Sequence, residues 1–158
     1  MEDKEQISVA AVKRNCAWIK GVTEALGNFH DENISRCVMN SAGTECANQI
    51  LEKTISYYGK QPQSVTELVE AINKRRREVL KADTFWELDG NKAHFILNKC
   101  SCDLVEEGLA EPSPIFCLCS AAMFENVFRP FHHGEVRAEI IKAIGRNDKY
   151  CEFIVSLK

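Results

Sequence analysis

Hydrophobic residues recur at helical spacing in three stretches of the first half of the chain. The first stretch runs from about Asp3 to Leu26, and Gly27 follows where a glycine commonly caps a helix end. The third begins at a capping box, in which the Ser64 hydroxyl accepts from the third amide of the helix and the Glu67 carboxylate reaches back. Each stretch therefore predicts an amphipathic helix.

The middle stretch predicts the longest of these helices. Asp31 or Asn33 is a suitable N-cap, and the pattern continues to Tyr57 or Tyr58, before Gly59.

This long helix carries two cysteines on either side of a glycine. An ideal helix turns about 900° over nine residues, so Cys37 and Cys46 should face opposite ways unless the helix bends at Gly43. One interpretation is two buried cysteines and a close helix contact at Gly43. The other places both cysteines in a site with the later cysteines of the chain.

Beyond Ala82 the hydrophobic period changes from helical to alternating. The segments 84–88 and 92–99 flank Asp89-Gly90-Asn91, which predicts a β-hairpin. Alternation in the second strand would place five side chains on one face. These are His94, Ile96, Asn98, Cys100 and Cys102.

A fourth helix is predicted from Phe116 to Phe128, ending before Pro130 because proline disfavours helix at the preceding residue. Cys117 would head an apolar stripe on this helix, formed with Phe124, Phe128 and the later Phe131.

Two further strands, 135–141 and 150–157, are joined by a turn at 145–148. Cys151 alternates with Phe153 and Val155 on one face of the last strand. The predicted order is ααα-ββ-α-ββ, an α+β fold of N-terminal helices packed with an antiparallel sheet. We expect a single ligand-binding-type domain over 1–158, with a helical part at 1–81 and a ββαββ part at 82–158.

Composition limits the classes of function. The chain of 158 residues is 45% hydrophobic and 27% charged, which is typical of a globular domain with a substantial core. A net charge of −3 argues against a nucleic-acid partner. No run approaches the ~20 apolar residues of a membrane span, and the N-terminal residues show no apolar signal segment. We therefore expect a cytoplasmic protein, in which thiols stay reduced.

Five of the eight cysteines lie between residues 100 and 151, and four of them form two C-x-C pairs. They are Cys100, Cys102, Cys117, Cys119 and Cys151. The first interpretation is a zinc site, because zinc binds four thiolates tetrahedrally. C-x-C spacing brings two thiols together only where the strand bends or where the cysteines precede the first helical turn. Cys151 is the weakest of the candidate ligands.

Two other interpretations of the cysteines stay open. Cys117 and Cys119 near a helix N-terminus would have a lowered pKa and act as reactive thiolates, with His94, His132 or His133 as the available bases. His132 and His133 are more simply residues of an exposed turn. Alternatively, the thiols pack as small apolar groups around a core or a ligand pocket, and Cys151 fits this best.

The C-terminal half resembles known families. The residues that carry the resemblance are Phe116-Cys-Leu-Cys119-Ser-Ala-Ala, Phe124-Glu125, Gly134-Glu-Val136 and Ile144-Gly-Arg-Asn-Asp-Lys-Tyr-Cys151-Glu-Phe-Ile-Val. They are similar to the 4-vinyl reductase-type, hydrocarbon-binding domains, which share a fold with Bet3-like trafficking subunits and haem–nitric-oxide sensor domains. The pattern also resembles a small uncharacterised bacterial cysteine-rich family and, more distantly, L-2-amino-thiazoline-4-carboxylate hydrolase.

The resemblance implies helices and a sheet that enclose an apolar pocket. The side chains expected to line it are Phe116, Met123, Phe124 and Phe128. Some relatives hold zinc through cysteines and a glutamate, which would place the metal on Cys117 or Cys119, Glu125 and Cys151 of this chain.

We therefore expect a ligand-binding or sensor domain for a small apolar molecule, with a cysteine cluster that can hold zinc and with a homodimer as the oligomeric state to test. The alternative is a small hydrolase of thiazoline or amide substrates, with a cysteine nucleophile or a metal-bound water. A protein-interaction subunit is a third hypothesis, which rests on the fold analogy alone.

Overall fold

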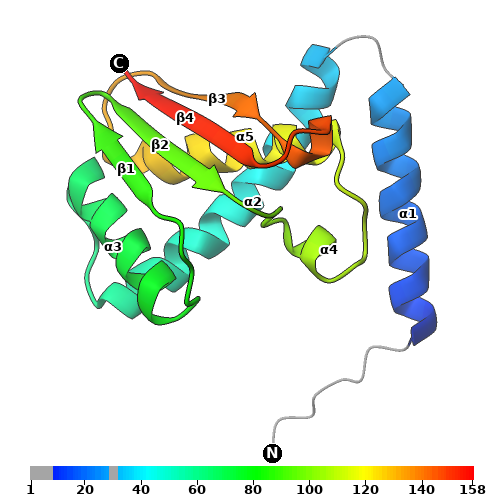
Figure 1. Cartoon of the computed structure of the whole chain (residues 1–158), viewed down its shortest axis with the longest axis horizontal. Coiled ribbons are helices and arrows are strands. Elements are labelled where there is room, and N and C mark those ends of the chain that lie inside the picture. The colour runs from blue at the N-terminus through cyan, green and yellow to red at the C-terminus, as the bar shows by residue number, and fades with distance from the viewer. Residues whose placement is uncertain (1–8, 29–31) are drawn as a thin grey trace, which may run out of the picture.

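A computed structural model describes residues 9–28 and 32–158 (Figure 1). Its helices are α1 Val9–Asn28, α2 Glu32–Tyr58, α3 Val65–Glu78, α4 Asp103–Glu106 and α5 Pro114–Phe128. Its strands are β1 Trp86–Asp89, β2 Lys92–Leu97, β3 Val136–Lys142 and β4 Cys151–Leu157, and its short 3-10 helices are η1 Arg129–Phe131 and η2 Ile144–Arg146. The predicted α+β fold and the order ααα-ββ-α-ββ are confirmed, with the short α4 inserted before α5.

The first two helices follow the sequence pattern with changes at their ends. Gly27 lies inside α1 instead of capping it. Helix α2 ends at Tyr58, and Gly59 follows with a left-handed φ of 80°, as expected for a glycine after a helix end. The predicted start at Asp3 and the alternative N-cap Asp31 lie outside the described residues.

Helix α3 begins with half of the predicted capping box. The amide of Glu67 donates to the Ser64 hydroxyl at 3.2 Å, as expected. The Glu67 carboxylate does not return to Ser64, however, but accepts from the amide of Gln63 at 2.8 Å and pairs with Lys60.

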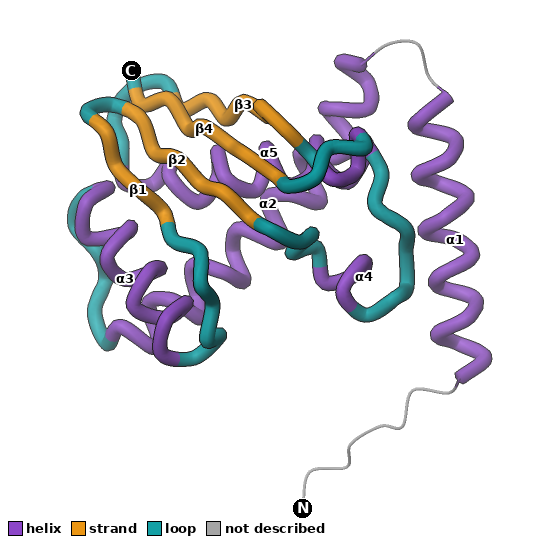
Figure 2. The backbone as a smooth tube through the Cα atoms, in the orientation of Figure 1, coloured by secondary structure: helices purple, strands orange, loops and turns teal. Residues whose placement is uncertain are grey.

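The four strands form one antiparallel sheet in the order β1-β2-β4-β3 (Figure 2). The predicted hairpin joins β1 to β2, with Gly90 at a left-handed φ of 56°. Ala93, Phe95 and Leu97 of β2 are buried, and so are the alternate residues of β4 from Cys151 to Leu157. One face of the sheet therefore forms the core, and the helices cover it.

The second strand is shorter than the alternation predicted. It ends at Leu97, so Asn98, Cys100 and Cys102 do not continue its outer face. Cys102 is instead the N-cap of α4. The chain turns out of the sheet here because the residues after Leu97 have no strand partner on β4, whose pairing with β2 stops at Cys151.

An aromatic cluster at the centre of the core joins the sheet to α5. Its members are Trp86, Phe95, Phe124, Phe128 and Phe153. Trp86 stacks on Phe95 with ring centroids 4.5 Å apart, and Phe124 meets Phe153 edge-on at 4.9 Å. Helix α5 therefore lies between the sheet and α2, as Figure 1 shows.

A second, smaller hydrophobic cluster lies around the first turn of α5. Leu26 of α1 and Met39 of α2 pack there against Ile115, Phe116 and Leu118. Helix α1 contacts this cluster through Ile19, Val22 and Leu26 in its C-terminal half (Figure 1). Across residues 9–28 and 32–158, no helix has the length and hydropathy needed to cross a membrane.

Candidate functional site

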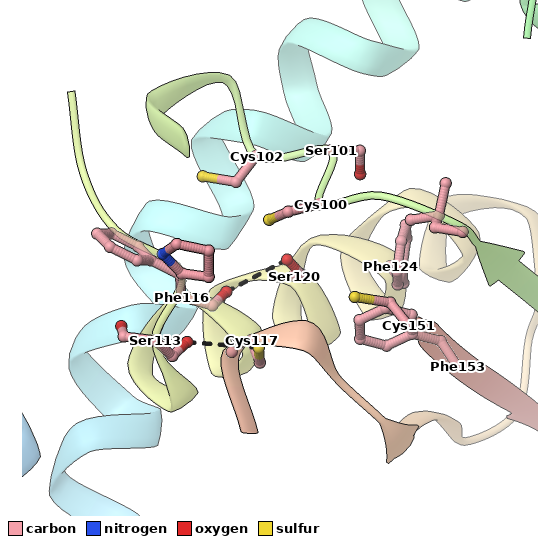
Figure 3. Close-up of a pocket in the computed structure, with 13 residues that line it drawn as sticks. Cys100, Ser101, Cys102, Ser113, Phe116, Cys117, Ser120, Phe124, Cys151 and Phe153 are labelled. Carbon is pink, nitrogen blue, oxygen red and sulfur yellow. Dashed lines mark hydrogen bonds between the residues drawn. The ribbon is translucent and has the colours of Figure 1, made fainter. Parts of the chain in front are cut away.

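A small cavity lies where the two hydrophobic clusters meet (Figure 3). Its volume is about 20 Å³, which is room for roughly one water molecule. The lining comes from the end of β2 and the segment after it, and from α5, η2 and β4. It consists of Leu97, Cys100, Ser101, Cys102, Pro112, Ser113, Phe116, Cys117, Ser120, Phe124, Gly145, Cys151 and Phe153.

The N-terminal turn of α5 forms one wall of this cavity. Ser113 is the N-cap, and its carbonyl oxygen accepts from the Cys117 amide at 3.3 Å and from the Cys117 thiol at 3.4 Å. Gly145 of η2 packs on the same turn, because a Cβ atom there would lie 2.5 Å from the Ser113 carbonyl oxygen and 2.9 Å from the Cys117 sulfur. Glycine is therefore required at this position.

Four of the five cysteines that the sequence singled out reach the cavity. Cys100 and Cys102 come from the segment that follows β2, Cys117 comes from α5, and Cys151 is the first residue of β4 (Figure 3). Cys151 also accepts a hydrogen bond from the Ile144 amide at 3.4 Å. The structure therefore brings together four thiols that are spread over more than 50 residues of the sequence.

Three of the four cavity thiols are poor thiolates. Burial raises the pKa of Cys117 to about 11, and it also raises the pKa of Cys102 and of Cys151. The expected lowering by the helix N-terminus is wrong for Cys117, because loss of solvent outweighs the effect of the adjacent amides. At neutral pH these groups are protonated and weakly polar.

Cys119 does not line the cavity and contacts α2 instead. Its thiol donates a hydrogen bond to the sulfur of Cys46. This bond, more than burial, raises the pKa of Cys119, so the expected lowering is wrong here too. The same bond lowers the pKa of Cys46 to about 7, against the opposing effects of burial, Asp103 and Glu45.

The pair accounts for one of the two cysteines of α2. The close helix contact at Gly43 is confirmed, because a Cβ atom there would lie 2.7 Å from the Cys119 carbonyl oxygen. The expected burial of Cys37 and Cys46 is wrong, since both side chains are exposed. The sequence signal for the Cys46–Cys119 pair was Gly43, one turn before Cys46.

The described side chains form no group of ligands of the kind that the zinc expectation requires. Among residues 9–28 and 32–158, no three Cys, His, Asp or Glu side chains are grouped so that they can hold a metal ion. Glu125, which the resemblance placed near a metal, accepts from the Ala138 amide at 3.0 Å and lies near Arg129. This carboxylate therefore attaches α5 to the edge strand β3.

The aromatic residues predicted to line a pocket divide into two groups. Phe116 and Phe124 line the cavity. Phe128 is fully buried in the aromatic cluster, and Met123 packs at its margin, so neither belongs to the lining. Sequence reasoning missed the hydroxyl groups of the lining, on Ser101, Ser113 and Ser120, because isolated serines carry no periodic signal. The Ser113 hydroxyl is buried and has no hydrogen-bond partner.

Comparison with protein families gives one match that covers most of the chain. The model for methanogen output domain 1 matches residues 32–156. The chain belongs to this family. The match begins at the start of α2 and ends in β4, so the cavity cysteines and the Cys46–Cys119 pair lie within the output domain.

Other comparisons establish the fold of this output domain. No curated protein matches the sequence. A crystal structure of trafficking protein particle complex subunit 3 from Naegleria fowleri, covalently bound to palmitic acid, is similar with a TM-score of 0.59 and 12% identity. The similarity covers 96% of this chain and 97% of that chain. The fold implied by the resemblance to Bet3-like subunits is thereby confirmed.

None of the histidines of the output domain lines the cavity. His94 is on the outer face of β2, in register with Glu87 and Ile154. His132 bonds the carbonyl oxygen of Lys158 at 3.1 Å, and its neighbour His133 is exposed. A cysteine–histidine pair, which the hydrolase hypothesis requires, is not present among the hydrogen bonds of the described residues.

Proposed function

We propose that this output domain binds a small apolar molecule in the cavity between α5 and the segment 98–113, and that binding changes the position of this segment. The observation that carries the proposal is the composition of the lining, which combines aromatic rings, protonated thiols and few polar groups at the junction of two hydrophobic clusters. Ligand sites in proteins are mostly apolar, with a small number of placed polar groups.

The segment 98–113 is suited to move. Its only helix, α4, has four residues and none of them is buried. It attaches to the second cluster through partly buried side chains, among them Cys102 and Leu104. Moving it therefore exposes little apolar surface, whereas moving α5 would break the aromatic cluster.

In its closed form the cavity holds no more than a water-sized molecule, so ligand entry requires this movement. The Ser113 hydroxyl is buried without a hydrogen-bond partner, which is unfavourable. A hydrogen bond to a polar end of the ligand would remove this cost. The structural neighbour with bound palmitic acid supports the idea that this fold accommodates an acyl chain. A reduced, cytoplasmic setting belongs to the proposal, since it keeps the cavity thiols free.

Titration with the fluorescent apolar amine N-phenyl-1-naphthylamine, with palmitic acid as competitor, tests the proposal. The wild type should bind the probe saturably at one site, and palmitic acid should displace it. Ser120→Leu places a larger apolar side chain in the cavity and should weaken binding at least tenfold. Ser41→Leu, the same change on the exposed side of α2, is the matched control and should bind normally.

Hydrogen exchange with and without the probe tests the second half of the proposal. On probe binding, the protection of backbone amides from exchange should change in residues 98–113 and much less in β1 and β2. Saturable binding that Ser120→Leu leaves intact would place the ligand elsewhere and contradict the proposal, as would the absence of saturable binding.

A further inference from the structure

Helices α2 and α5 approach each other more closely than ordinary side chains permit. Gly43 lies against the backbone of α5, where a Cβ atom would be 2.7 Å from both the Cys119 carbonyl oxygen and the Met123 amide nitrogen. Cys46 lies three residues after Gly43, on the same side of α2. The close backbone approach therefore brings its side chain onto α5.

At this contact the two thiol side chains are neighbours. Their interaction is the largest influence on the pKa of both groups, which places Cys119 next to Cys46. Cys46 is exposed to solvent, whereas Cys119 is half-buried. One sulfur is thus accessible to a reagent, and the second is held behind it.

We propose that Cys46 and Cys119 are a redox-active dithiol, in which Cys46 attacks a low-molecular-weight disulfide and Cys119 resolves the product into a Cys46–Cys119 disulfide. Neither cysteine lines the cavity, and the inference does not depend on the proposed function.

The reaction proceeds in two exchanges. The Cys46 thiolate attacks one sulfur of the small disulfide, forms a mixed disulfide with it and releases the other half as a thiolate. The Cys119 thiol then loses its proton to solvent, and its sulfur attacks the Cys46 sulfur and releases the second small thiol. The protein pair loses two electrons and two protons, and the small disulfide is reduced to two thiols.

The electrostatics suit these roles. With a pKa of about 7, roughly half of Cys46 is thiolate at neutral pH, which favours attack. Asp103 and Glu45 raise this pKa, and the hydrogen bond from Cys119 outweighs them. Cys119 has a raised pKa through that bond, its burial and the neighbouring Cys46 and Cys102, so it stays a thiol until Cys46 has reacted.

Oxidised glutathione added to the reduced full-length protein without any ligand tests the proposal, with intact mass and denatured thiol count as readouts. The wild type should lose two thiols and retain no glutathione. Cys119→Ser should retain one glutathione on Cys46, because the resolving sulfur is missing. Cys46→Ser should react at least ten times more slowly. Cys37→Ser, which removes another exposed thiol of α2, is the matched control and should behave as wild type.

The pH dependence gives a second readout. Deprotonation activates Cys46, so the rate rises with pH. A pKa of about 7 predicts an increase of about tenfold between pH 6 and pH 8, whereas an ordinary thiol of pKa 9 would give an increase of about a hundredfold.

Three results would overturn the inference. They are a stable glutathione adduct on the wild type, a disulfide that still forms in Cys46→Ser, and a rate that rises as for an ordinary thiol. Circular dichroism of each serine variant confirms that the fold is unchanged, since serine differs from cysteine only at one atom. Because no apolar ligand is present, failure here leaves the proposed ligand site untouched.

Discussion

The two halves of α5 pack differently: one contributes large aromatic rings and the other small thiols. Its C-terminal half contributes Phe124 and Phe128 to the aromatic cluster, where ring centroids lie 4.5 to 5.7 Å apart. Its N-terminal half contributes Cys117 and Cys119 to a region of small thiols, a cavity and an unpaired hydroxyl. We refer to this second region as the thiol end of the domain.

The difference shows how one helix can serve both stability and function. Large rings fill space and hold the sheet against α5, so the aromatic cluster fixes the position of the helix. Thiols are small and leave room, and the segment that covers them is weakly attached. A ligand or a reagent can therefore act at the thiol end without unfolding the rest, and the following substitutions test this separation.

The largest effect is expected for Phe128→Ala. Phe128 is fully buried and meets Trp86 edge-on at 5.0 Å, so its loss should reduce the free energy of unfolding by about 3 to 5 kcal/mol. Urea unfolding measures the change. Phe131→Ala, at a half-buried ring just beyond α5, should have a clearly smaller effect. Equal losses in the two variants would show that the aromatic cluster is not the main source of stability.

An intermediate effect is expected for Asn73→Ala. The Asn73 amide donates to the Trp86 carbonyl oxygen at 2.8 Å and accepts from the Trp86 amide at 2.9 Å, which attaches α3 to β1. Removing both bonds should reduce the free energy of unfolding by about 2 kcal/mol. Asn48→Ala on the exposed side of α2 is the control. If both variants are equally stable, this attachment does not support the aromatic cluster.

The smallest effect concerns the thiol end and depends on pH. Burial raises the pKa of Cys117 from 9 to about 11, so the stability due to its protonated thiol is complete below pH 9 and is lost as the pH rises towards 11. Between pH 8 and pH 10 the free energy of unfolding of the wild type should fall by about 1 kcal/mol more than that of Cys117→Ala. Unfolding of both proteins at the two pH values measures this difference, and parallel pH profiles would contradict it.

Local patterns predicted most elements and their buried faces. The helical period located α2 and α5 to within about two residues, and Asp89-Gly90-Asn91 located the hairpin. The prediction failed where alternation was extended past Leu97, because a strand continues only where a neighbouring strand offers hydrogen bonds. The sequence does not show where that neighbour ends.

The candidate site could be predicted only in part. Clustering along the chain selected five cysteines, of which Cys100, Cys102, Cys117 and Cys151 line the cavity and Cys119 does not. Their arrangement could not be inferred from the sequence, because burial depends on residues far away in sequence. The pairing of Cys46 with Cys119 was hidden for the same reason. The only nearby sequence feature, Gly43, predicts a close helix contact but not which element makes it.

The sequence by itself determined the fold class, the order of the elements and the face that each one buries, since these depend on periodicity within short segments. Only the tertiary structure decided which thiols line a cavity and which two sulfur atoms meet. Those relations depend on how α2, α5 and the segment 98–113 approach one another, and that approach is set by packing over the whole core, not by any local pattern.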